Sequence, residues 1–63
     1  MASGVEIRTT QKNALFDLLV LKKEMENEKD TVGYKGLHKL IIRMEAAMEP
    51  EDVAYVEKKI AEL

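Results

Sequence analysis

Five apolar side chains in the middle of the chain recur at spacings of three and four residues: Leu37, Leu40, Ile41, Met44 and Met48. On a helix this spacing gathers side chains into one stripe, which is typical of a face packed against neighbouring helices. An apolar segment precedes the stripe and a shorter amphipathic segment follows it. We therefore expect Gly36–Met48 to be the organising helix, in contact with a helix on either side.

A longer helix is predicted upstream, over Gln11–Glu28, with the hydroxyls of Thr9 and Thr10 available to cap its first amides. Between Ala14 and Leu21 the only polar residue is Asp17, and a helix that is apolar nearly all round is buried on more than one side. The stripe expected to face the chain's own helices consists of Ala14, Leu18, Leu21 and Met25.

The other side of this long helix carries Phe16 and Val20, with Leu15 and Leu19 on the flank between the two faces. Two short companion helices can cover one side of a long helix but hardly both. A second copy of the chain is the natural cover for the remaining side, because a twofold interface is self-complementary. The sequence therefore predicts a homodimeric helical bundle with Phe16, Val20, Leu15 and Leu19 at the interface.

Turn and capping signals divide the rest of the chain. Asp30–Gly33 has the chemistry of a turn, and Gly36, which is costly inside a helix, is expected to mark a helix start or a close approach of the first helix. The second helix is predicted over Tyr34–Met48. Pro50 suits the first position of a third helix, followed by acidic residues that favour its positive end. Its apolar stripe is Val53, Val56, Ile60 and Leu63.

The N-terminal segment, residues 1–8, is predicted to be a tail, and residues 9–63 a single helical domain. Val5–Arg8 alternates apolar with polar residues, the period of a strand, but four residues are few, and an extended tail lying across the helices is the favoured interpretation. The expected fold class is thus all-α, with a long helix, a hairpin turn, a second helix and a short third helix.

The size of the chain favours association. A domain of 63 residues buries only about 60% of the surface that its unfolded chain exposes, so the monomer is marginal. Small domains commonly add disulfides, a metal or a partner subunit. The sequence contains no cysteine, which excludes disulfides and thiolate metal sites and leaves oligomerisation.

The sequence contains no recognisable arrangement of catalytic, phosphate-binding or metal-binding residues. His38 is the one histidine, and its neighbours one helical turn away, Tyr34 and Ile42, include no carboxylate to orient it. Ser3, the one serine, lies in the predicted tail, and the glycines form no phosphate-binding loop. We therefore expect neither an enzyme, nor a cofactor, nor a bound metal.

The most specific charged feature of the sequence is a row of three cations on the second predicted helix. Lys35, Lys39 and Arg43 are four residues apart and form a basic row on one helix face, which either contacts an acidic partner or phosphates or is simply solvated. The net charge of −2 gives no general attraction to nucleic acid or to anionic membranes. No apolar run reaches the roughly 20 residues that span a bilayer. A cytoplasmic protein is expected.

Two functions remain open at this point. The first is an oligomeric helical interaction module that acts as a regulator, adaptor or inhibitor by binding another protein. The alternative is a dimeric DNA-binding regulator of the ribbon-helix-helix type, in which Val5–Arg8 pairs with its twofold mate. The negative net charge, the long first helix and the additional third helix disfavour this alternative.

Overall fold

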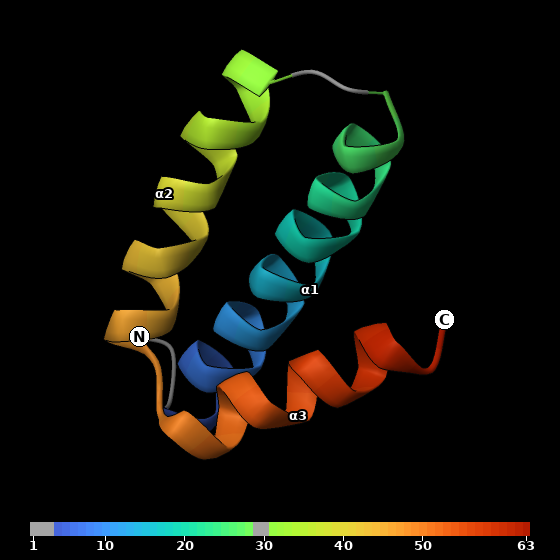
Figure 1. The fold of residues 1–63 in the computed structure, drawn as a ribbon. Coiled ribbons are helices and arrows are strands. Elements are labelled where there is room, and N and C mark those ends of the chain that lie inside the picture. The colour runs from blue at the N-terminus through green and yellow to red at the C-terminus, as the bar shows by residue number, and fades with distance from the viewer. Residues whose placement is uncertain (1–3, 29–30) are drawn as a thin grey trace.

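The computed structural model describes residues 4–28 and 31–63, and all of its regular structure is helical. Three α-helices follow one another: α1 (Gly4–Glu28), α2 (Thr31–Ala47) and α3 (Pro50–Ala61). Figure 1 shows α2 running back alongside α1, whereas α3 turns away from α2 and crosses the half of α1 nearer the N-terminus. The prediction of an all-α fold with three helices is confirmed.

The helix that packs extensively against both of the others is α1, not α2 as we expected. Both α2 and α3 pack mainly against α1 (Figure 1). With 25 residues, α1 is long enough to serve both neighbours, since each residue adds about 1.5 Å. Only Met48 and Glu49 separate α2 from α3, and Pro50 begins α3 in a new direction.

The first helix begins seven residues before the expected Gln11, at Gly4. The extended conformation predicted for Val5–Arg8 is therefore wrong, and Thr9 and Thr10 lie inside the helix instead of capping it. A helix pairs its backbone groups locally, whereas four extended residues need a partner strand, and the described part of the chain contains none. The division into a tail and a domain at residue 8 stays a prediction, and residues 1–3 lie outside the described residues.

The second helix also begins earlier than expected. Thr31, Val32 and Gly33, predicted as a turn, belong to α2, while Asp30 lies outside the described residues. Gly36 lies within α2, and a Cβ atom built on it meets nothing within 4 Å. It therefore marks neither the helix start nor a close approach of α1.

The third helix follows its sequence signals closely. Pro50 occupies the start of α3, and Glu49 before it has the extended backbone of an N-cap residue (φ −67°, ψ 137°). The backbone N–H groups of Asp52 and Val53 donate to the Glu49 carbonyl at 2.9 and 3.1 Å. Lys58 and Lys59 lie in the last turn, where cations are favoured by the helix dipole.

The core draws on all three helices. Its buried members are Leu15, Leu37, Ile41, Met48 and Val56, and seven partly buried side chains pack against them: Phe16, Leu18, Leu19, Met25, Met44, Val53 and Ile60. Leu15, expected on the flank of α1, is fully buried, whereas Leu40 and Leu21, expected in the core, are 50% and 43% exposed. Leu63, expected in the stripe of α3, is also exposed.

The position of α1 between two neighbours explains this rotation. Leu15 of α1 is fully buried, and the core cluster that it joins includes Leu37 and Ile41 of α2 and Val56 of α3. Leu21 follows six residues later, which on a helix is about 120° away from Leu15. The sequence pattern identifies apolar residues correctly but not the direction from which two helices approach.

Candidate functional site

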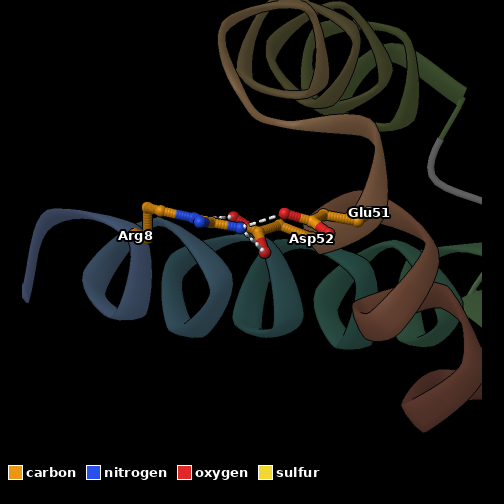
Figure 2. A network of polar contacts seen from close by, with 3 residues as sticks. All are labelled: Arg8, Glu51 and Asp52. Carbon is orange, nitrogen blue, oxygen red and sulfur yellow. Dashed lines mark hydrogen bonds and ion pairs between the residues drawn. The ribbon is translucent and has the colours of Figure 1, made fainter. Parts of the chain in front are cut away.

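An arginine fork joins the beginnings of α1 and α3. The Arg8 Nε donates to Asp52 Oδ2 at 2.8 Å, and its Nη2 donates to Asp52 Oδ1 at 2.9 Å and to Glu51 Oε1 at 2.6 Å. Figure 2 shows the guanidinium lying between the two carboxylates. Paired hydrogen bonds between a guanidinium and a carboxylate fix orientation as well as distance. The fork therefore sets where the N-terminal end of α3 rests on α1.

Asp52 is the buried acidic residue of the described chain, with 5% of its surface exposed. The hydrogen bonds from Arg8 hold the pKa of the Asp52 carboxyl below its ordinary value of 3.8, against the opposing effect of burial. The charges of Arg8 and Lys12 act in the same direction as the hydrogen bonds. Hydrogen bonds to Asp52 and Glu51 raise the pKa of Arg8 in turn. Arg8 and Asp52 are therefore both charged at neutral pH.

A cleft of about 260 Å³ lies beside this fork, where α3 crosses α1. Lys12 and Phe16 line it from α1, and they follow Arg8 at intervals of four residues on the same helix face. Tyr55, Val56 and Lys59 line it from α3, and Asn13 completes the lining. The contacts that fix α3 on α1 thus also shape the cleft.

Lysines surround an aromatic ring at this cleft. The ammonium nitrogens of Lys12 and Lys59 lie 5.1 and 5.6 Å from the centroid of the Tyr55 ring, within the range of cation–π attraction. Phe16 is partly buried against the core and supplies apolar surface, whereas Val56 belongs to the core and is only 2% exposed. Ammonium, hydroxyl and amide groups beside apolar surface are suited to binding a group that is apolar on one side and anionic on the other.

Little in the sequence points to this site. Arg8 and Asp52 are 44 positions apart, and no local pattern links them. The interval of four between Arg8, Lys12 and Phe16 becomes visible as a helix face only once α1 is known to begin at Gly4. The alternation of Val5–Arg8 predicts an extended segment instead, and an extended segment has no helix face.

The predicted interface residues are dispersed by the fold. Leu15 is fully buried in the core, and Phe16 and Leu19 are partly buried against it. Val20 is partly buried. These four side chains do not form one exposed patch, because Leu15 lies in the core and Phe16 lines a cleft together with residues of α3.

The predicted basic face is exposed. Lys35, Lys39 and Arg43 are all exposed along α2, and they take no part in the ion pairs found between described residues. Val32 and Ile42 are exposed on the same helix. This basic face therefore combines cations with apolar side chains.

His38 belongs to a small cluster that bridges α1 and α2. Its ring lies parallel to that of Tyr34, with centroids 6.2 Å apart and an interplanar angle of 4°. The Tyr34 hydroxyl donates to Glu26 Oε1 at 3.0 Å, and the Lys22 ammonium lies 5.7 Å from the Tyr34 ring centroid. The neighbours of His38 are those of a surface side chain that helps to align two helices.

Among the residues that the structure describes, no three histidine, cysteine or acidic side chains come together as metal ligands. The described helices also include none with the length and apolarity needed to cross a membrane. No protein-family model, curated protein or solved structure matches the chain.

Proposed function

We propose that this chain is a small helical interaction module that self-associates and binds another protein. The supporting observation is the balance of apolar surface within residues 4–28 and 31–63. Eight large hydrophobic side chains there are exposed, against five that are buried. Exposed apolar surface beyond scattered single residues marks a protein interface.

Self-association is assigned to the outer face of α1. Ile7, Ala14 and Leu21 are separated by seven residues, the repeat that pairs helices in coiled coils. Ile7 and Leu21 are exposed, while Ala14 is partly covered and small enough to let another helix approach. A second α1 related by a twofold axis would cover this stripe, so the proposed interface centres on Leu21 instead of Phe16 and Val20.

Light scattering across a range of protein concentrations tests self-association. We expect the parent chain to have the mass of a dimer, or of a higher oligomer built from such pairs, and Leu21→Glu to have the mass of a monomer with its helical content retained. Ile42→Glu is the matched control, because it places the same charge on an exposed position of α2. A parent that is monomeric at high concentration would refute this part of the proposal.

The basic face of α2, Lys35, Lys39 and Arg43, is the surface proposed to meet an acidic partner protein. Exposed Ile42 beside these cations supplies the apolar contact that a protein partner needs. The nucleic-acid alternative is weaker, because the ribbon-helix-helix arrangement needs Val5–Arg8 as a strand, and these residues are helical. The cytoplasmic location expected from the sequence stays a prediction.

Chromatography on heparin separates the two functions. An interaction module with a net charge of −2 should elute at low salt, whereas a nucleic-acid-binding protein should be retained and released only at high salt. Lys39→Glu combined with Arg43→Glu removes any retention that depends on the basic face. Strong retention of the parent that this double variant abolishes would favour the nucleic-acid function.

A further inference from the structure

We propose that the cleft between α1 and α3 is an anchor pocket for one apolar side chain of a partner protein, presented within an acidic segment. This inference rests on the proposed interaction function and names the chemistry of the partner at a second surface. Its basis is the lining of the cleft, in which the apolar surface of Phe16 lies beside the Tyr55 ring and the ammonium groups of Lys12 and Lys59.

The volume of the cleft limits which groups can bind in it. At about 260 Å³, and open to solvent, it is smaller than the roughly 300–1,000 Å³ of pockets that enclose whole small molecules or cofactors. One apolar side chain fits a space of this size, and anchors of that kind dominate the energetics of many protein interfaces. Phe16 is packed against the core that contains Val56, so its apolar surface is formed before the partner binds.

The lysines at the cleft favour acidic residues next to the partner side chain that binds there. Lys12 and Lys59 come from different helices and are both close to the Tyr55 ring, so two cations stand near the apolar surface. Lys59 also lies 3.9 Å from Glu62, but this pair is about half exposed and three residues apart on one helix end, so a partner carboxylate can replace it at little cost. Acidic residues next to the anchoring side chain complement this arrangement.

The same chemistry disfavours a nucleic acid at this site. Single-stranded nucleic acids bind by stacking bases on aromatic side chains, and lysine ammonium groups already lie against the Tyr55 ring. The lining of the cleft supplies two cations, which suffice for a short acidic segment but offer no track of positive charge for a phosphate backbone.

Amide chemical shifts of the full chain, titrated with two acetylated tripeptide amides, test the inference. The first peptide has the sequence Glu-Phe-Glu and the second Gln-Phe-Gln, so they share the apolar side chain and differ only in charge. We expect the acidic peptide to shift the resonances of Lys12, Phe16, Tyr55 and Val56, with the neutral peptide binding about tenfold more weakly.

The lysines are tested by a double variant and a matched control. Lys12→Gln with Lys59→Gln should weaken the acidic peptide about tenfold, while Lys22→Gln with Lys23→Gln, which removes the same charge from α1 outside the lining of the cleft, should leave its affinity unchanged. Equal affinity in both double variants, shifts confined to other surfaces, or tighter binding of a thymidine hexanucleotide at the same residues would overturn the anchor pocket.

Failure of the anchor pocket and failure of the proposed function have different signatures. A parent that is monomeric in light scattering but binds the acidic peptide at Tyr55 and Val56 refutes self-association and keeps the anchor pocket. A parent that forms dimers but shows no charge-dependent shift at the cleft refutes the anchor pocket and leaves the dimer.

Discussion

Asp52 shows how one side chain couples two helices. Its carboxylate accepts two hydrogen bonds from Arg8, while the side chain of Glu51, which accepts one, is mostly exposed. We expect Asp52→Asn to lower the melting temperature, because the buried amide can no longer accept both bonds and Arg8 loses its main counter-charge. Glu51→Gln is the matched control and should melt close to the parent. Equal melting of all three proteins would show that the fork does not hold α3 in place.

The same carboxylate predicts how stability depends on pH. The pKa of Asp52 is lower in the folded chain than in the unfolded chain, so its contribution is fully present above about pH 4 and is lost as the pH falls through the folded value. The denaturant concentration at the midpoint of unfolding should therefore decrease as the pH is lowered below about 4. The fall should be shallower in Asp52→Asn, and parallel curves for the two proteins would contradict this assignment.

Gly36 is the residue whose replacement should stabilise the chain. It lies inside α2 with open space where a Cβ atom would stand, so alanine fits without a clash and reduces the freedom of the unfolded chain. Gly36→Ala is expected to raise the free energy of unfolding by about 0.5–1 kcal/mol. Ala46→Gly, at an exposed position of the same helix, should lower it by a similar amount. A loss of stability in Gly36→Ala would mean that the glycine has a packing role.

Along the helix α2, neighbouring residues can lie in the core and in solvent. Ile41 is 3% exposed and belongs to the core, whereas Leu40 next to it is half exposed. Ile41→Ala should therefore cost about 2–5 kcal/mol of unfolding free energy, and Leu40→Ala less than about 1 kcal/mol. Thermal or denaturant unfolding of the two variants gives the comparison. A larger loss in Leu40→Ala would mean that this side chain is covered in solution.

At the scale of the molecule, the three helices leave much apolar surface in water for a chain of 63 residues. If a second copy covers the outer face of α1, folding and association are linked, and the melting temperature must rise with protein concentration. We expect this rise in the parent and in Ile42→Glu, and none in Leu21→Glu. Melting that is independent of concentration in the parent would assign the exposed stripe to a different partner protein.

Features that depend on neighbouring residues were predictable from the sequence. The start of α3 is predicted by Pro50 and the acidic residues after it, and its end by the lysines in the last turn. These signals suffice because capping and dipole effects act within one helical turn. Four of the five residues of the predicted stripe, Leu37, Ile41, Met44 and Met48, belong to the core or pack against it, since a spacing of three and four defines one face of a helix, whereas Leu40 is exposed.

The tertiary structure alone decided how those faces are used. Because α2 and α3 both pack on α1, the buried direction of α1 passes through Leu15 and leaves Leu21 exposed, and no periodicity within α1 contains that information. The Arg8–Asp52 fork and the cleft beside it join residues far apart in the chain, and such contacts follow from the crossing of α3 over α1. Local patterns determine helices, whereas the direction of approach between helices determines the surfaces with which this protein can bind.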